Sequence, residues 1–199
     1  MTEHYFTEKP TSELKKFKQK AMLRGNEIQF ITASGLFSPK QVDKGTKILI
    51  ESADIKENQS ILDLGCGYGI VGLTLKKTMP TIEVTATDIN ERAISITKEN
   101  FRFHHLKANI FQSNGFEKIK EQFDVILVNP PQSAGKDLCI KLIKESKEHL
   151  KPKGSLQLIA RPNKGGKTLS EIMKATFNNV TILTRKVGYC LYKSEKQAF

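Results

Sequence analysis

The sequence lacks the features that mark membrane, secreted or repetitive proteins. No apolar run approaches the roughly 20 residues that a membrane-spanning helix needs, and residues 1–10 contain no apolar secretory core. Internal repeats and low-complexity arms are also missing. These absences predict a soluble, cytoplasmic protein. The length of 199 residues favours one domain, or one domain with a small appendage.

Cysteine is scarce, and the three present are Cys66, Cys139 and Cys190. They are widely spaced and form no Cys-x-x-Cys pair, and an odd number does not suit a closed disulfide framework. Structural zinc usually needs four clustered Cys or His ligands. The expectation is therefore reduced thiols and no metal.

Negative charge is in short supply, because 32 Lys and Arg face 21 Asp and Glu for a net charge of +11. A basic balance favours a polyanion such as nucleic acid as the partner, although a lysine-rich solvated surface would give the same count. The candidate phosphate contacts are Lys15, Lys16 and Arg24 in a basic N-terminal segment, and Lys136 further along.

From residue 60 onward, short apolar segments alternate with amphipathic ones. Strands are expected at 60–64, 82–87, 108–111, 123–128 and 155–160, and helices at 69–79, 91–103, 138–150 and 168–177. This alternation predicts a parallel sheet covered on both faces. Two final strands, 180–183 and 188–192, are too close for a crossover helix and must pair antiparallel. The expected fold is α/β and Rossmann-like, with a mostly parallel seven-stranded sheet that ends in an antiparallel C-terminal hairpin.

The first quarter of the chain has a different pattern. We expect a short helix from Ser12 to Leu23, then a β-hairpin in which 27–32 pairs with a return strand beginning at 36–37, and a second short helix ending near Ala53. The sequence thus divides into an N-terminal extension, residues 1–55, packing on the cofactor site, and a main domain, residues 56–199.

A glycine-rich loop, Asp63–Gly69, follows the first expected strand and opens a helix, as a nucleotide-binding loop does. Its third glycine comes too early for the dinucleotide spacing G-x-G-x-x-G. Asp63 would repel a pyrophosphate but attract the ammonium and sulfonium groups of S-adenosylmethionine, so the loop favours that cofactor over NAD. The loop residues expected to contact the cofactor are Asp63, Gly65, Cys66, Gly67 and Gly69.

The next loop along the sheet contains Asp88 and Ile89. A carboxylate at this place can accept hydrogen bonds from both ribose hydroxyls, and Ile89 can pack on the adenine. The alternative is that Asp88 only caps the following helix.

A third loop reads Asn129-Pro-Pro-Gln132 after a strongly apolar strand. Two prolines fix a stiff, extended backbone, so the Asn129 amide oxygen and the Pro130 carbonyl can both accept hydrogen bonds from one NH₂ group. That would direct the nitrogen lone pair toward a methyl donor, by positioning rather than by strong base. The expected catalytic residues are Asn129, Pro130 and Pro131; the alternative is a rigid turn without catalysis.

Together these loops resemble class I methyltransferases that carry Asn-Pro-Pro, and more closely the methyltransferase small domain family, which includes rRNA guanine-N2 methyltransferases and archaeal single-domain relatives. The resemblance extends over His4–Pro10, Gly35–Ser38, Val42–Thr46, Asp63–Gly69, Asp88, Asn129–Pro131 and Ala134–Lys136. It implies that Phe37, Ser38 and Thr46 border the cofactor pocket. Asn114 stands where the family often has an acidic residue that holds the adenine, and Gln132 where it often has an apolar or aromatic residue near the substrate.

The resemblance implies methyl transfer from S-adenosylmethionine to an exocyclic amine of a base in RNA, with guanine N2 of rRNA favoured and S-adenosylhomocysteine as the second product. The implied partner is RNA, without a membrane; the oligomeric state stays open, and a monomer is plausible. The alternatives are tRNA, DNA adenine N6, protein glutamine N5 and a non-catalytic cofactor-binding module. Gln132 weighs against adenine and glutamine, because a stacking aromatic is missing there.

Overall fold

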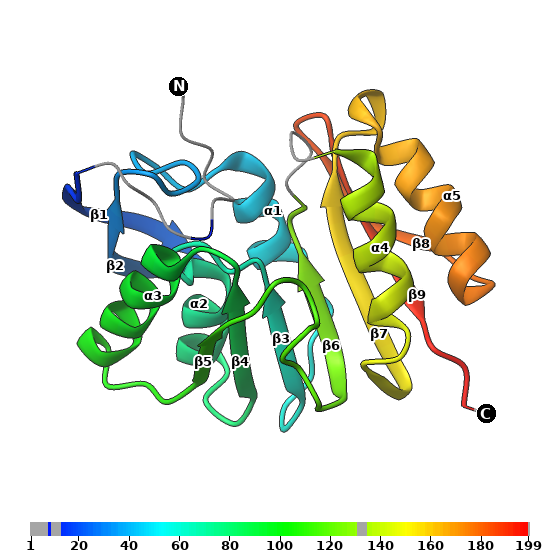
Figure 1. Ribbon diagram of the computed structural model, residues 1–199, viewed down its shortest axis with the longest axis horizontal. Helices are drawn as coiled ribbons and strands as arrows, with labels where there is room; N and C mark the ends of the chain where they lie inside the picture. Colours follow the sequence, from blue (N-terminus) through cyan, green and yellow to red (C-terminus); the bar gives the residue numbers. More distant parts are fainter. Residues whose placement is uncertain (1–7, 9–12, 131–134, 199) are drawn as a thin grey trace.

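A central sheet organises the protein, which is described from a computed structural model covering residues 8, 13–130 and 135–198. Its strands are β3 (Ser60–Leu64), β4 (Glu83–Asp88), β5 (Asn109–Gln112), β6 (Phe123–Val128), β7 (Leu150–Ala160), β8 (Thr181–Lys186) and β9 (Tyr189–Glu195). They lie in the order β5-β4-β3-β6-β7-β9-β8 (Figure 1). The first five are parallel, and β9 is antiparallel to both β7 and β8. The expected mostly parallel seven-stranded sheet with its antiparallel hairpin is confirmed.

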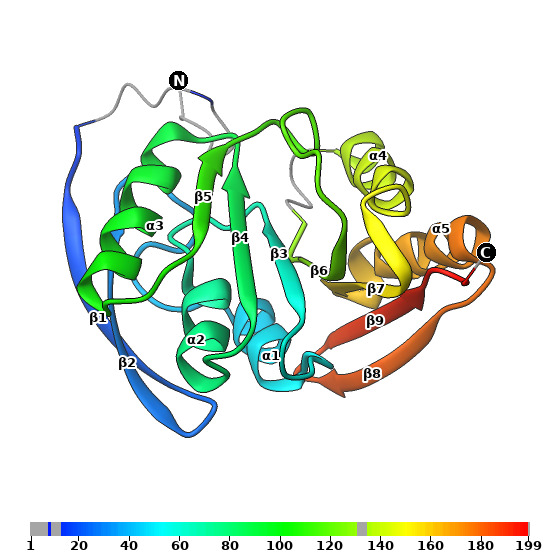
Figure 2. The ribbon, with the colours of Figure 1, turned by 90° about the horizontal axis from the view of Figure 1, so that it is seen from below.

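Helices cover both faces of this sheet (Figure 2). One face carries α1 (Lys44–Ser52), α2 (Ile70–Thr78) and α3 (Glu91–Phe103), and the other carries α4 (Lys136–Ser146) and α5 (Gly166–Phe177). Successive strand side chains point to opposite faces, so Ile61 and Val125 pack in the first helical layer while Leu62 and Ile126 pack in the second. Burial on both faces explains why these strands are continuous apolar runs.

The strand order places a crevice between β3 and β6. From β3 the chain proceeds outward to β4 and β5, and then returns to the other side of β3 to form β6 and β7. Where the order reverses, the connections leave in opposite directions, and ligands of open α/β sheets bind beyond the carboxyl ends of the strands there. The loops after β3, β4 and β6 are the ones that the sequence singled out.

The expected helix from Ser12 to Leu23 is wrong. Lys16–Leu23 forms strand β1, which pairs antiparallel with β2 (Asn26–Ala33). The turn between them is Arg24-Gly25, and both residues have positive φ, 47° and 73°, as a two-residue hairpin turn requires. The segment 36–37 is therefore not the return strand. The less exposed residues of β1 are Phe17, Gln19, Ala21 and Leu23, so only the polar Gln19 interrupts an apolar period-two pattern.

The hairpin is joined to the main domain through one buried amide. Asn100 on α3 donates to the Ile31 carbonyl (2.9 Å) and the Tyr68 carbonyl (2.8 Å), and its oxygen accepts from the Ile31 N–H (2.7 Å). The rings of Phe30 and Tyr68 stack with centroids 5.5 Å apart. β2, α3 and the glycine loop therefore share a single core.

Two further observations concern disulfide bonds and membrane-spanning helices. All three cysteines are buried and free of disulfides. Within the described ranges, no helix combines the length and apolarity needed to span a bilayer.

Candidate active site

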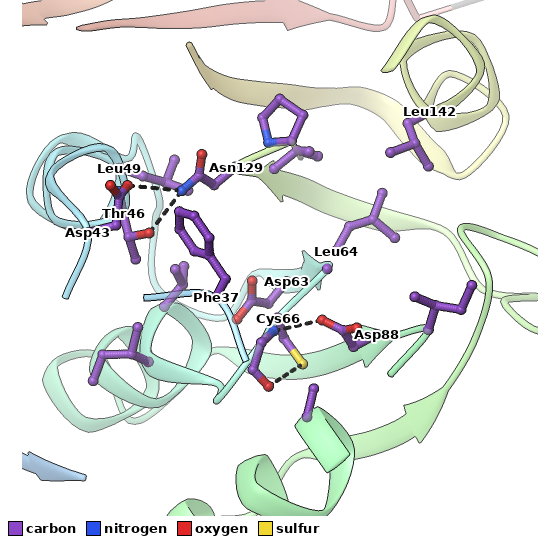
Figure 3. Close-up of a pocket in the computed structure, with 18 of the residues that line it drawn as sticks. Phe37, Asp43, Thr46, Leu49, Asp63, Leu64, Cys66, Asp88, Asn129 and Leu142 are labelled. Atoms are coloured by element: carbon purple, nitrogen blue, oxygen red, sulfur yellow. Dashed lines mark hydrogen bonds between the residues drawn. The ribbon is translucent and has the colours of Figure 1, made fainter. Parts of the chain in front are cut away.

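A cavity of about 570 Å³ lies beyond the carboxyl ends of β3, β4 and β6 (Figure 3). Its walls come from the segment 36–49, the glycine loop, and the residues that follow β4, β6 and β7. The volume is that of a small-molecule or cofactor site, roughly 300–1,000 Å³. In the part of the chain that is described, no cluster of His, Cys, Asp and Glu could hold a metal ion.

The glycine loop presents bare backbone to this cavity. Gly65 and Gly67 have φ of 73° and 58°, and a Cβ added at either would meet nothing within 4 Å. The N–H groups of Gly65 and Cys66 both donate to the Thr87 carbonyl, at 2.8 and 2.9 Å, which fixes the loop to β4. A ligand can therefore approach the main chain without a side chain in between.

Gly69 has a packing role. A Cβ there would lie 2.5 Å from Cγ2 of Thr97, so the absent side chain lets the start of α2 pack against α3. Gly69 does not line the cavity, unlike Gly65, Cys66 and Gly67. Its expected cofactor contact stays a prediction that this geometry does not favour.

Two carboxylates line the cavity, one of them buried and the other partly buried. Asp63 is 3% exposed and accepts a hydrogen bond from the Gly72 N–H at 3.0 Å; burial raises its pKa from 3.8 to about 7. Asp88 accepts from the N–H groups of Gly67 (2.8 Å) and Asn90 (2.9 Å), and burial raises its pKa as well. The ion pairs found among the described residues include neither carboxylate. The site is therefore suited to a ligand that brings positive charge or hydroxyl donors.

Asn90, and not Asp88, caps the helix α3 that follows this loop. The Asn90 side chain accepts from the N–H groups of Arg92 and Ala93. Asp88 is thus placed before the cap, with its carboxylate on the cavity wall.

Other expected cofactor contacts divide into two groups. Phe37, Cys66, Ile89 and Asn114 line the cavity, and the Asn114 amide donates to Glu117 at 2.8 Å. Burial raises the pKa of the Cys66 thiol, which disfavours a thiolate there. Ser38 does not line the cavity, and its hydroxyl donates to the Gln41 carbonyl at 2.7 Å.

Asn129 is held by the start of α1. Its Nδ2 donates to Thr46 Oγ1 at 2.9 Å and to Asp43 Oδ2 at 3.4 Å (Figure 3). Asp43 in turn caps α1, accepting from the Thr46 N–H at 3.1 Å. A carboxylate can only accept, so the amide nitrogen must face α1. The Asn129 oxygen is then the group left for a ligand, beside Pro130 on the cavity wall.

The N-terminal basic residues lie away from this site. Lys15 and Lys16 pair with Glu13 (3.2 Å) and Glu99 (2.7 Å). Arg24 lies in the hairpin turn, and its N–H donates to Glu51 near the end of α1 remote from Asn129. Their role as phosphate contacts stays a prediction. Lys136 begins α4 and is exposed, outside the cavity wall.

Two expected substrate-side residues cannot be placed. Pro131 and Gln132 lie outside the described residues. Pro130 is described and lines the cavity, as expected.

Three residues that line the cavity on the β7 and β9 side of Asn129 were not predicted from the sequence. Arg161 follows β7, Lys164 lies in the 3₁₀ turn η2 (Pro162–Lys164), and Tyr189 begins β9. The Arg161 guanidinium lies 4.6 Å from the centre of the Tyr189 ring. The sequence does contain a signal for Arg161, because this residue follows an expected parallel strand just as Asn129 does. Tyr189 had none, since its place depends on the pairing of β7 with β9.

Several known proteins are similar to this chain in sequence. The family model for the methyltransferase small domain matches residues 27–193. An uncharacterised protein of Bacillus subtilis, YbxB, is 35% identical over 200 residues, covering 98% of this chain and 100% of YbxB. Ribosomal RNA small subunit methyltransferase C of Hamiltonella defensa is 32% identical over 172 residues, covering 84% of this chain and 50% of that protein.

A solved structure has the same fold. The 16S rRNA N2 G1207 methyltransferase of T. thermophilus, in complex with AdoMet and guanosine, superposes with a TM-score of 0.83 at 24% identity, covering 94% of this chain and 52% of that chain. The present chain thus spans about half the length of the ribosomal RNA methyltransferases that it matches. The family match covers most of the sequence, and the chain belongs to the methyltransferase small domain family.

Proposed function

We propose that the protein transfers the methyl group of S-adenosylmethionine to the N2 amine of a guanine in ribosomal RNA. The observation that carries the proposal is Asn129, whose amide nitrogen is bound to Thr46 and Asp43 so that its oxygen stays available to accept from an amine. Family membership and the rRNA methyltransferases among the relatives support the reaction and the substrate class. Transfer RNA is the alternative within the same chemistry.

The cavity residues fit this cofactor. Asp63 is buried, and no ion pair among the described residues involves it, so the ammonium group of the cofactor would compensate its charge. Asp88 has a carboxylate on the wall for the ribose hydroxyls. Ile89, Leu142 and the Cys66 side chain offer apolar surface for the adenine. When bound, the cofactor supplies an electrophilic methyl group on a sulfonium.

Asn129 and Pro130 would orient the methyl acceptor. Their oxygens accept the two hydrogens of a planar NH₂ group, which leaves its nitrogen lone pair pointing along the line of attack. The amine nitrogen held in this way would take the methyl group as its bond to sulfur breaks, with S-adenosylhomocysteine as the second product, and would then release one proton to solvent. Positioning is the main contribution, so no strong base is required.

The N-terminal extension would complete the cofactor site. The sequence predicts that residues 1–55 pack on the cofactor site of the main domain, residues 56–199, and we propose that this extension closes one wall of the pocket. Leu36, Phe37, Asp43, Thr46 and Leu49 all line the cavity, and Thr46 and Asp43 support Asn129.

Radiolabelled S-adenosylmethionine tests the function. Incubation with total RNA and with ribosomal subunits, followed by nucleoside analysis, should give N2-methylguanosine in rRNA. Label in tRNA would replace the proposed RNA class, and label in adenine of DNA or in glutamine of protein would replace the reaction. Cofactor binding without transfer to any of these would indicate a binding module.

Asp88→Ala is expected to weaken cofactor affinity by roughly 1–3 kcal/mol, because the two ribose hydroxyls lose their acceptor. Calorimetric titration measures this directly. The matched control is Glu83→Ala, which removes an exposed carboxylate from the other end of β4. Affinity equal to wild type would remove Asp88 from the cofactor site.

A further inference from the structure

The two cations on the cavity wall, Arg161 and Lys164, lie apart from Asp63 and Asp88. Along the sheet, Asp88 ends β4, Asp63 lies in β3, Asn129 follows β6 and Arg161 follows β7. Neighbouring strands lie about 4.8 Å apart, so Arg161 is the next position beyond Asn129, on the side away from Asp63 and Asp88. Lys164 lies on the same wall. Asp63 and Asp88 therefore border one half of the cavity and Arg161 and Lys164 border the other, with the carboxylate of Asp43 between them beside Asn129.

Arg161 is held in place by its surroundings. Its guanidinium lies over the Tyr189 ring at 4.6 Å, a cation–π arrangement. The Tyr189 ring fits against Gly45, where a Cβ would come within 2.8 Å of Cε1. The Arg161 carbonyl accepts from the N–H groups of Lys164 and Gly166, both at 3.0 Å, which closes the loop after β7. A cation presented in this way is already ordered before a ligand arrives.

The cations on this side lack acidic partners. In the described ranges, no ion pair involves Arg161, Lys164 or Lys186, and Lys186 lies opposite Tyr189 in the β8–β9 pairing. Two of the three lysines of β1 are paired, Lys16 with Glu99 and Lys20 with Glu27. Arg161 and Lys164 are therefore unpaired cations on the cavity wall itself.

We infer that Arg161 binds the phosphate group of the nucleotide whose base is methylated, with Lys164 and Lys186 following the RNA backbone away from the site. The inference rests on the proposed function: a base whose amine meets Asn129 has the cofactor on its β3 side, so its ribose and phosphate lie over β7 and β9. A guanidinium offers the paired donors that match phosphate oxygens.

Binding of RNA to Arg161→Ala tests the inference without requiring catalysis. A short fluorescent single-stranded RNA containing guanine is titrated at several salt concentrations, with the protein saturated with S-adenosylhomocysteine. Loss of a charge-assisted hydrogen bond should weaken binding about tenfold or more, and the slope of log K against log salt should fall by about 0.7. Arg161→Lys should retain the slope but recover only part of the affinity, and Lys164→Ala with Lys186→Ala should lower the slope further.

Two controls separate a phosphate contact from a general loss of charge and from a contact with the cofactor. Arg102→Ala removes an equal charge from the far end of α3 and should change neither affinity nor slope. Cofactor affinity and melting temperature are measured for every variant, because a carboxylate of the cofactor is the other anion that Arg161 could bind. Unchanged cofactor affinity in Arg161→Ala is expected, and a tenfold loss would assign Arg161 to the cofactor and overturn the inference.

The RNA-binding and methylation experiments give different results depending on whether the phosphate contact or the proposed function is wrong. If wild type methylates guanine and Arg161→Ala binds RNA with wild-type affinity and slope, the phosphate contact is refuted and the function stands. If Arg161→Ala weakens RNA binding while wild type labels a different base or another RNA, the contact stands and the target assignment is refuted.

Discussion

Asn129→Ala is expected to lower the methyl transfer rate by about 10²- to 10³-fold or more while cofactor affinity stays close to wild type. The oxygen of Asn129 is the acceptor that would fix the amine, and groups that stabilise the reacting atoms contribute about this much. Single-turnover transfer from radiolabelled cofactor measures the chemical step, and calorimetry measures cofactor binding.

The support of Asn129 can be tested in the same assay. Thr46→Val removes the acceptor 2.9 Å from the amide nitrogen and should slow transfer, whereas Thr46→Ser keeps the hydroxyl and should restore most of the rate. An equal loss of cofactor binding and transfer in Asn129→Ala would contradict a role confined to the methyl acceptor.

Asp63→Asn should weaken cofactor binding and stabilise the ligand-free protein at the same time. Burial raises the pKa of Asp63 to about 7 from the ordinary 3.8, so folding disfavours the ionised form. This cost is absent below pH 4, grows as the pH rises to about 7, and is complete above it. A shift of about three units corresponds to at most about 4 kcal/mol. The variant should therefore melt higher than wild type at pH 8 and equally at pH 4.

The same carboxylate should make cofactor affinity depend on pH. Attraction of the ammonium requires ionised Asp63, so wild-type affinity should tighten about tenfold between pH 6 and pH 8, and Asp63→Asn should lose this dependence. Glu83→Gln, at the exposed end of β4, is the control. A pH profile in Asp63→Asn equal to that of wild type would assign the titration to another group.

The sequence predicted best what depends on local pattern. The run Phe123–Val128 is buried on both faces of the sheet and could only be an interior strand. The helix at 91–103 matches α3 at both ends, because its apolar spacing and its Asn90 cap agree. The carboxyl-end rule then placed Asp63, Asp88 and Asn129 around one cavity.

What the sequence did not predict depends on contacts between distant segments. The bond between Asn129 and Thr46 joins residues 83 positions apart, so Thr46 was interpreted as a cofactor contact rather than as a support for Asn129. The Arg161–Tyr189 contact depends on the register that pairs Ala160 with Cys190. The strand β1 was wrongly predicted as a helix, although its exposed and less exposed residues alternate, because the pairing with β2 that makes it a strand is not visible in the segment alone.

The three hydrogen bonds of Asn100 have a thermodynamic consequence. One side chain holds Ile31 in the hairpin and Tyr68 in the glycine loop, so opening of the hairpin removes a restraint from the loop that borders the cofactor. β2 contributes no residue to the cavity wall, yet its local opening and ligand occupancy become linked equilibria. Such linkage is reciprocal: a ligand that orders the loop must also make the remote hairpin more resistant to local unfolding.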